Sequence, residues 1–293
     1  MSFEWLQSNL KNEAFNASRP FPIKKHPKVI FVNTGDVLQG KFLHCTFSDS
    51  DKLPGQAKKS LKKDDILLTE IRPSNGRFAY VDFEPENYIV STKFMVIESY
   101  GRVLPRFLYY VLTNSLALDN FQRIAESRSG TFPQITFDAI ELFPVPVPPI
   151  TAQIDIASFF DDVNCRLDLL RETNTTLESI AQTLFKSWFV DFDPVKAKAE
   201  GRLPEGMDEA TAALFPSEFE ESALGLIPKG WRVGTLGNIA RLHKGSINPL
   251  HHHNTVFEHY SLPSFDNEQS PVREAGIEIK SNKTSVPKNA VLL

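Results

Sequence analysis

The chain has 293 residues, of which 41% are hydrophobic, and a formal net charge of −4. This length exceeds that of one ordinary domain, so we expect two domains joined by a connecting segment. The sequence shows no apolar run long enough to span a bilayer and no charged-then-apolar leader at Met1, and its two cysteines lie far apart. These features predict a reduced, cytoplasmic protein with no membrane partner.

The acidic charge is confined to the middle of the chain. Residues 1–150 carry a net charge of +2, residues 151–230 carry −8 and residues 231–293 carry +2. The first 63 residues are rich in lysine, including Lys24, Lys25, Lys28, Lys58, Lys59, Lys62 and Lys63. Clustered basic residues are typical of phosphate contact, although lysine runs are more often solvated surface. The charge pattern is therefore compatible with DNA binding without requiring it.

Residues 1–148 are predicted to form one globular, mostly β domain. We expect a helix within residues 1–22 that breaks at Pro20, then short strands, then helical structure over residues 104–126. The strands are expected over residues 29–32, 36–38, 66–69, 77–81 and 94–97. A loop over residues 127–134 and a proline-spaced strand over residues 143–148 complete the domain.

Residues 149–192 are predicted to form one long helix. From Ile156 onward, apolar positions recur at alternating steps of four and three residues, which is the seam of a coiled coil. The seam residues that we expect to pair with another helix are Phe160, Val163, Leu167, Leu170, Asn174, Leu177, Ala181, Leu184 and Trp188. One buried asparagine in such a seam fixes register and partner number, as Asn174 would here. A long two-helix spacer is favoured, and one helix of a bundle core is the alternative.

Residues 193–230 are rich in Ala, Glu and Pro and predict an extended connector. Ordered structure is expected to resume near Trp231. Residues 286–293 then repeat the pattern of residues 61–68, which is apolar, any, Lys, Asp/Asn, any, Ile/Val, Leu, Leu. The match predicts that a second copy of the first domain begins near Trp231 and is incomplete at Leu293.

The sequence offers no convincing active site. Glu278 and Lys280 have the Glu-x-Lys form of many metal-dependent nucleases, but an acidic partner is not evident, so a surface strand is favoured. The run from His251 to His253 has no spaced cysteine or carboxylate partners, and no metal site is predicted.

Two polar loops suit DNA binding instead. Residues 72–77 carry two arginines and an asparagine, the side chains that recognise guanine and adenine edges. Residues 127–131 offer hydroxyl groups and an arginine for phosphate contact. The candidate DNA-binding residues are Lys58, Lys59, Arg72, Asn75, Arg77, Arg128 and Gln134. An ordinary polar surface position is the alternative for each of them.

Several stretches resemble the specificity subunit of type I restriction–modification systems. They are Ser129-Gly130-Thr131 with Pro133-Gln134-Ile135, Phe143-Pro144-Val145-Pro146 with Pro148-Pro149, and Phe189-Val190-Asp191-Phe192-Asp193-Pro194. The resemblance covers most of the chain from about Val29. It implies an α+β fold class with four parts. These are a mostly β target recognition domain (1–148), a long coiled-coil-type spacer helix (149–192, the first conserved region of the family), a connector (193–230) and an incomplete second recognition domain (231–293).

The resemblance also implies a function. In that family, each of two recognition domains recognises half of a bipartite DNA site, and two long antiparallel helices set the spacing. The subunit is not catalytic. S-adenosylmethionine, ATP and Mg are expected on partner modification and restriction subunits, and no cofactor is expected on this chain.

The expected partners are double-stranded DNA and these modification and restriction subunits. The seam has no second spacer helix within this sequence, so we also expect two chains to pair antiparallel through it. Two other interpretations stay open. One is a non-catalytic coiled-coil scaffold or adaptor that binds a protein partner, and the other is a nuclease using Glu278 and Lys280. The target bases and the spacer length do not follow from the sequence.

Overall fold

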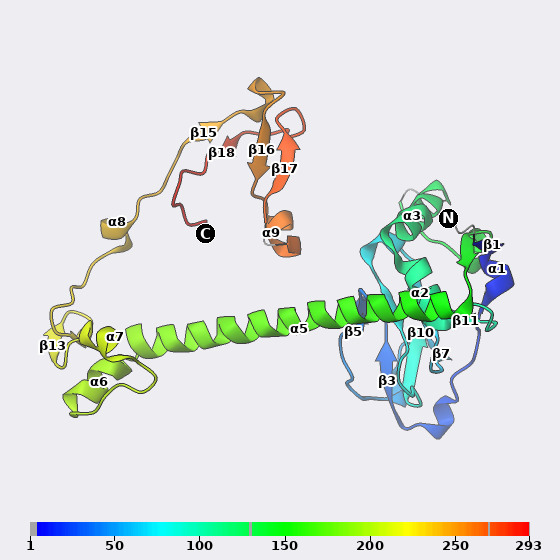
Figure 1. Cartoon of the computed structure of the whole chain (residues 1–293), viewed down its shortest axis with the longest axis horizontal. Coiled ribbons are helices and arrows are strands. Elements are labelled where there is room, and N and C mark those ends of the chain that lie inside the picture. Colours follow the sequence, from blue (N-terminus) through cyan, green and yellow to red (C-terminus); the bar gives the residue numbers. More distant parts are fainter. Residues whose placement is uncertain (1–4, 129–130, 269, 293) are drawn as a thin grey trace. The chain divides into compact units, whose positions relative to one another are not determined.

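The computed structural model describes residues 5–128, 131–268 and 270–292. The chain divides into two compact units, Met1–Leu177 (unit 1) and Glu178–Leu293 (unit 2). The long helix α5 (Ile150–Phe189) begins in unit 1 and ends in unit 2 (Figure 1).

The start of unit 1 forms strands rather than the predicted helix. β1 (Leu6–Asn9) and β2 (Ala14–Asn16) flank the one-turn helix α1 (Leu10–Glu13). β1 pairs with the proline-spaced strand β12 (Pro144–Val147), and β2 pairs with β11 (Phe94–Ser99), both antiparallel. The helix prediction was wrong over residues 5–22, because pairing with distant strands overrides a weak local pattern. Residues 1–4 of that prediction lie outside the described residues.

Two four-stranded sheets form the body of unit 1 (Figure 1). The first has the order β2-β11-β8-β9 and is antiparallel, with β8 at Ile66–Thr69 and β9 at Phe78–Tyr80. The second has the order β6-β3-β10-β7, with β3 at Lys28–Val32, β6 at Ser48–Asp49, β7 at Ala57–Ser60 and β10 at Tyr88–Ser91. Its strands β3 and β10 are parallel. The strands expected over residues 29–32, 36–38, 66–69, 77–81 and 94–97 are confirmed, with the strand over 36–38 shortened to Val37–Leu38. The sequence analysis did not predict β7 and β10.

Short elements fill the connections of unit 1. They are η1 (Ile23–Lys25), η2 (Thr34–Asp36), β4 (Val37–Leu38), β5 (Lys41–Phe42), η3 (Ser50–Lys52), η4 (Pro73–Asn75) and α4 (Phe137–Ile140). The helical segment predicted over residues 104–126 is two helices, α2 (Pro105–Thr113) and α3 (Ser115–Arg128). Asn114 separates them, and its Oδ1 accepts a hydrogen bond from Ala117 N at 2.9 Å.

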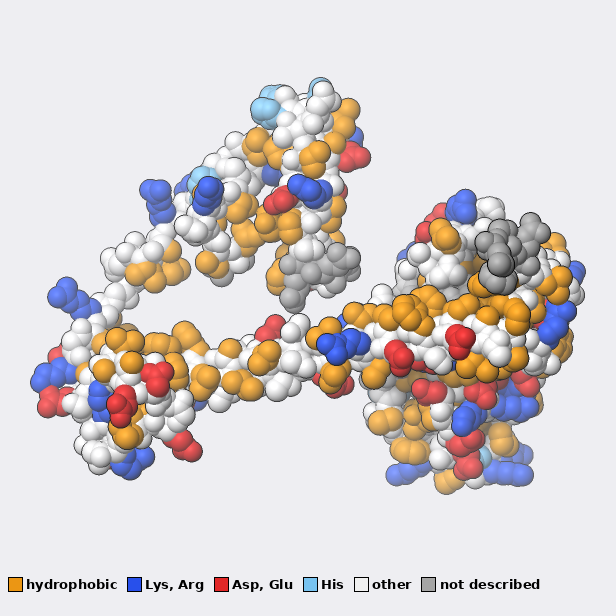
Figure 2. Space-filling model, viewed as in Figure 1, with side chains coloured by type: hydrophobic (Ala, Val, Ile, Leu, Met, Phe, Trp, Pro, Cys, Tyr) orange, Lys and Arg blue, Asp and Glu red, His pale blue; other side chains and the backbone are white. Residues whose placement is uncertain are grey.

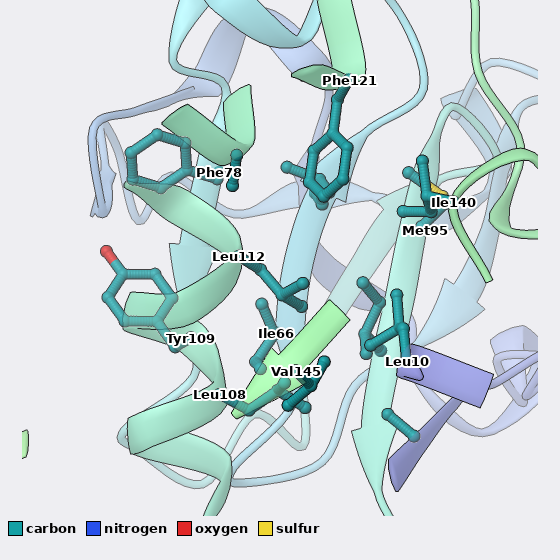
Figure 3. Close-up of a cluster of buried hydrophobic side chains, with 14 of the residues drawn as sticks. Leu10, Ile66, Phe78, Met95, Leu108, Tyr109, Leu112, Phe121, Ile140 and Val145 are labelled. Atoms are coloured by element: carbon teal, nitrogen blue, oxygen red, sulfur yellow. The ribbon is translucent and has the colours of Figure 1, made fainter. Parts of the chain in front are cut away.

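The first sheet is the middle layer of unit 1, because it buries both of its faces. On β8, Ile66 and Leu68 belong to one hydrophobic cluster, and Leu67 between them belongs to another. This alternation follows from the period of two in a strand. The first cluster also contains Leu108 and Leu112 of α2, which lie against the sheet (Figure 3). The helices therefore cover one face of the sheet.

The segment after α5 is folded rather than extended, which corrects that expectation. α6 (Asp193–Ala199) and α7 (Glu209–Ala213) precede a hairpin of β13 (Phe219–Ser222) and β14 (Gly225–Pro228). An aromatic cluster holds these elements together with the end of α5. Its members are Trp188, Phe189, Phe192, Phe215 and Trp231, with ring centroids 5.6 to 6.3 Å apart. Aromatic packing thus replaces the long apolar periodicity that a sequence pattern would detect.

The remainder of unit 2 carries small paired strands. The elements are α8 (Leu236–Ile239), β15 (Ser246–Ile247), η5 (Pro249–His251), β16 (Val256–His259), α9 (Leu262–Glu268), β17 (Val272–Ala275) and β18 (Lys283–Thr284). Ser285 N donates to Gly245 O at 2.9 Å shortly before η5, and Ser60 N donates to Arg19 O at 2.8 Å shortly before η1. The two segments share this local hydrogen-bond pattern. That a second copy of the first domain begins in unit 2 stays a prediction, as do its bounds.

Candidate nucleic-acid interface and helix seam

The turn between β8 and β9 presents Arg72 and Asn75 to solvent. Arg72 has a φ of +43° and Gly76 a φ of +67°, so the backbone makes two left-handed steps around η4. Neither the Arg72 nor the Asn75 side chain has a hydrogen-bond or ion-pair partner within the described ranges. Arg77 differs, because its Nη1 donates to Gly35 O (3.1 Å) and Val37 O (3.0 Å). Arg77 therefore fixes the neighbouring turn, while Arg72 and Asn75 are available for a ligand.

The loop that precedes α4 lies against this turn. Gln134 forms a β-bridge with Ile71, and its Nε2 donates to Glu70 Oε2 at 3.0 Å. Arg128, at the end of α3, donates to Thr136 Oγ1 at 3.1 Å. Ser129 and Gly130, which belong to the predicted phosphate-contacting loop, lie outside the described residues. The fold thus brings the turn at residues 72–77 and this loop to one edge of unit 1.

Lys58 and Lys59 lie on β7, in the other sheet. The Lys59 Nζ donates to Phe94 O at 2.6 Å, and burial lowers the pKa of this ammonium group. Lys58 is exposed, and its backbone carbonyl accepts a hydrogen bond from Phe21 N at 2.8 Å. The structure therefore leaves Lys58 exposed and Lys59 half-buried, with its ammonium group bound to the backbone. DNA contact by the seven candidate residues stays a prediction.

A second basic surface lies in the segment after Phe21, whose N–H donates to Lys58 O. We call Lys24, Lys25 and Lys28 the lysine segment; the first two are on η1 and the third begins β3. All three side chains are exposed and make no ion pair among the residues the structure describes. Basic side chains gather at the lower end of unit 1 in Figure 2, below the position of β3 in Figure 1. The sequence signal for this surface is the lysine clustering, although the candidate residues did not include the lysine segment.

The first turns of α5 pack on unit 1. Gln153 is 1% exposed, and its Oε1 accepts from Leu104 N at 2.7 Å. Its Nε2 donates to Pro148 O (2.9 Å) and Arg102 O (3.3 Å). Ile156, the first position of the predicted seam, packs against the core cluster of unit 1 rather than facing a partner helix. These three hydrogen bonds between the buried Gln153 side chain and the backbone fix the position of the start of α5 on unit 1.

Beyond these turns the seam is open. Its large aliphatic residues and Phe160 are 39% to 57% exposed, and Figure 2 shows hydrophobic side chains along α5. Phe160 stacks partly on Tyr110, with ring centroids 5.1 Å apart, and Trp188 joins the aromatic cluster of unit 2. Asn174 is exposed between Leu170 and Leu177. Such a continuous exposed apolar row is typical of a surface that binds another helix.

Glu278 and Lys280, which have the Glu-x-Lys spacing of many metal-dependent nucleases, make local contacts. The Glu278 carboxylate accepts from Ala275 N at 3.0 Å, and Lys280 Nζ donates to Ile277 O at 3.1 Å. Among the described side chains, no group of three His, Cys, Asp or Glu residues could hold a metal ion. None of the helices within the described ranges is both long and apolar enough to cross a membrane.

Comparison with known proteins gives the class of this fold. The family model for the type I restriction modification DNA specificity domain matches residues 8–179. The chain belongs to this family.

Individual relatives agree with that assignment. The chain is 50% identical over 212 residues to the type I restriction enzyme HindI specificity subunit of Haemophilus influenzae, a match that covers 72% of this chain and 46% of the relative. It is 28% identical over 204 residues to the type I restriction enzyme MjaIX specificity subunit of Methanocaldococcus jannaschii, covering 69% and 41% respectively. The chain thus spans less than half the length of these two relatives.

A solved structure has a similar fold. The crystal structure of the HsdS subunit from Thermoanaerobacter tengcongensis superposes with a TM-score of 0.51 at 20% identity. The superposition covers 71% of this chain and 52% of that one. The predicted α+β architecture, a sheet-rich domain followed by a long helix, is confirmed by this likeness.

Proposed function

We propose that this chain is the DNA sequence-recognition subunit of a type I restriction–modification enzyme. Each recognition domain would bind half of a bipartite site in double-stranded DNA, and α5 would hold the modification subunits. The chain itself would be non-catalytic and act in the cytoplasm. S-adenosylmethionine, ATP and Mg would belong to the modification and restriction subunits. The observation that carries the proposal is a specificity-family domain that exposes basic side chains and continues into a long helix with an open apolar seam.

The DNA surface on unit 1 would combine two kinds of contact. The lysine segment would bind phosphates, because exposed ammonium groups without acidic partners release counterions when they meet DNA. The turn bearing Arg72 and Asn75 would contact base edges, for which arginine and asparagine have the required donor geometry. The local pairing shared by residues 19–60 and 245–285 supports a second recognition domain in unit 2.

Salt dependence of DNA binding tests this surface. Each phosphate contact contributes a slope of about −0.9 in log Kobs against log salt concentration. Replacing all three lysines of the lysine segment with glutamine should therefore flatten the slope by about 2 to 3. Lys52→Gln is the control, because Lys52 is 74% exposed and already pairs with Asp49. Failure of the wild-type chain to bind double-stranded DNA at low salt would favour the scaffold interpretation instead.

The open seam supports pairing of two chains through α5, in antiparallel orientation. Asn174 lies between the exposed residues Leu170 and Leu177. Without a partner helix, the whole apolar seam would stay in contact with water. Antiparallel pairing would place two copies of unit 1 at opposite ends of the helix pair. Sedimentation equilibrium at micromolar concentration tests this, and a clean monomer would contradict it.

The apolar face of α5 is wider than one partner helix requires. Leu169, Thr173, Thr176, Ile180 and Thr183 form a second row with the same alternating spacing. The three threonine hydroxyls donate to carbonyls of their own helix, at 2.7 to 2.9 Å, so they need no external hydrogen bond. This second row would accept a helix of a modification subunit. A pull-down with that subunit tests the assignment, and unchanged binding by Ile180→Lys would contradict it.

A further inference from the structure

One face of α5 is attached to unit 1 well beyond its buried start. The attached residues are Gln153, Ala157, Asp161, Asn164 and Asp168, at steps of four, four, three and four. This spacing keeps them on one side of the helix, on the face next to the seam. The helix therefore lies along the domain for about four turns, roughly 24 Å, before it leaves it.

Asp161 is the centre of this attachment. Its Oδ1 accepts from Arg106 Nε at 2.7 Å, and the Arg106 Nη2 approaches the same oxygen at 2.5 Å. Tyr110 also donates its hydroxyl hydrogen to Asp161, and Asn164 Nδ2 donates to the Tyr110 oxygen at 3.2 Å. One carboxylate thus joins two side chains of α2 to the helix.

Arg106 is itself held by the sheet. Its guanidinium lies over the Tyr80 ring of β9, 4.5 Å from the centroid, where a cation meets the negative face of the ring. The Tyr80 hydroxyl is fixed in turn by a 2.6 Å hydrogen bond to Asp64. A chain of contacts therefore runs from the sheet through Tyr80 and Arg106 to Asp161 on the helix.

The other attachment points differ in character. Gln153 and Ala157 are buried and lie close to the start of α5, so they act as a pivot and leave the direction of the helix less constrained. Lys41 Nζ lies 2.6 Å from Asp168 Oδ1, but both side chains are over one third exposed, where an ion pair contributes little. Asp161 is itself 39% exposed, but it accepts from both Arg106 and Tyr110, and the Arg106 guanidinium lies over the Tyr80 ring. The Arg106–Asp161 pair is therefore tied to unit 1 by more contacts than the Lys41–Asp168 pair.

Because α5 is long, a small change in its direction moves its far end by several ångströms. α5 continues for 28 residues after Asp161, which corresponds to about 42 Å. A change of about 5° in direction would move the far end by roughly 4 Å, close to the 3.4 Å rise of one base pair. A spacer that discriminates between lengths differing by one base pair therefore needs its direction fixed to within a few degrees.

We propose that the Arg106–Asp161 pair is the contact that fixes the direction of α5 relative to the recognition domain, and so the spacing between the two DNA half-sites. Arg106 and Asp161 are positioning residues in this proposal and touch no DNA. The claim about half-site spacing rests on the proposed function. The claim about the direction of α5 does not, and it can be measured without DNA.

The first test measures the helix direction. Spin labels are placed on the native Cys45 and on Glu172→Cys in a Cys165→Ser background, and labelled chains are diluted with unlabelled ones. Cys45 and Cys165 are both free and exposed, so the labelling chemistry needs little change. We expect one narrow distribution of the distance between the two labels when Arg106 and Asp161 are both present, and a broad distribution for Asp161→Asn.

Matched variants separate direction from general stability. Asp162→Asn removes a neighbouring carboxylate that has no ion pair or hydrogen bond among the described residues, and it should leave the distribution narrow. Asp161→Glu keeps the acceptor and should restore much of the narrowness, whereas Arg106→Gln should behave like Asp161→Asn. Equal distributions for Asp161→Asn and Asp162→Asn would overturn the proposal.

The second test measures spacing. The chain is expressed with its modification subunit, and methylated adenines are mapped across genomic DNA by single-molecule sequencing. We expect one spacer length for wild type, and for Asp161→Asn a roughly tenfold loss of discrimination against spacers one base pair longer or shorter, the factor that 1.4 kcal/mol produces. A single spacer at reduced yield would show that the pair only stabilises the domain. No defined motif with wild type would instead refute the proposed function, and the spacing role with it.

Discussion

Replacing Gln153 with alanine should destabilise unit 1 more than almost any other polar substitution on α5. The side chain is 1% exposed and forms three hydrogen bonds to backbone groups of residues that lie outside the helix. Truncation leaves the Leu104 N–H without its acceptor, and leaves Pro148 O and Arg102 O without this donor. A buried polar group that loses its partner costs about 1–3 kcal/mol. Together with the cavity, we expect a loss of about 2–4 kcal/mol in the free energy of unfolding.

Denaturation of the full chain measures this loss. For a unit of this size, about 2–4 °C in Tm corresponds to 1 kcal/mol, so the unit 1 transition should fall by roughly 5–12 °C. Circular dichroism follows the transition, and Gln182→Ala provides the control, since Gln182 is an exposed glutamine on the same helix. A loss below about 0.5 kcal/mol, the range of ordinary surface substitutions, would refute the reasoning.

Gln153→Glu sharpens the same prediction. It keeps the acceptor for Leu104 N but turns a carboxylate oxygen toward two carbonyls. Burial would raise the pKa of this carboxyl above its unfolded value, so only the protonated form can donate as the amide does. Relative to wild type, the free energy of unfolding of the variant should therefore be highest at low pH. This relative stability should be lost as pH rises through the folded pKa of the new carboxyl. A flat difference from wild type across pH 4 to 7 would argue against the assigned hydrogen bonds.

Three further predictions concern other parts of the chain. Glu13 is fully buried, and its hydrogen bond with Arg102 lowers the pKa of the Glu13 carboxyl. Its stabilising effect is present above the unfolded pKa and is lost as pH falls through the folded one, so Glu13→Gln should destabilise at pH 7 and have little effect near pH 3, as urea denaturation would show. Phe215→Ala should cost about 3–5 kcal/mol in unit 2, because Phe215 is 6% exposed within the aromatic cluster; an unchanged tryptophan fluorescence transition would contradict this. Asn174→Leu should tighten self-association and make its register less specific, and unchanged assembly by sedimentation would place Asn174 outside the interface.

The long helix was predictable because its determinants are local. A strict alternation of four- and three-residue steps and two prolines at Pro148-Pro149 define it, and the structure has it at Ile150–Phe189. The strand at Ile66–Thr69 was predictable for a similar reason, since four consecutive apolar or β-branched residues suit a strand buried on both faces.

Other features depend on contacts between distant residues and leave no local pattern. β1 forms only because a proline-spaced strand over 130 residues later pairs with it. The difference in burial between Lys58 and Lys59 depends on which face of β7 lies toward Phe94 O. The sequence alone does not distinguish these two adjacent lysines. The Arg106–Asp161 contact joins two helices 55 residues apart, and it is visible only once α5 is packed on α2.

The most direct test of the central claim is the methylation pattern that the chain directs. The chain would be expressed with the modification subunit in a host that lacks adenine methylation, and every methylated adenine would be mapped. We predict methylation at one defined bipartite motif that disappears when the chain is omitted, and a symmetric motif would mean that two chains pair. Methylation without a motif, or an identical pattern without the chain, would contradict the claim that it recognises DNA sequence.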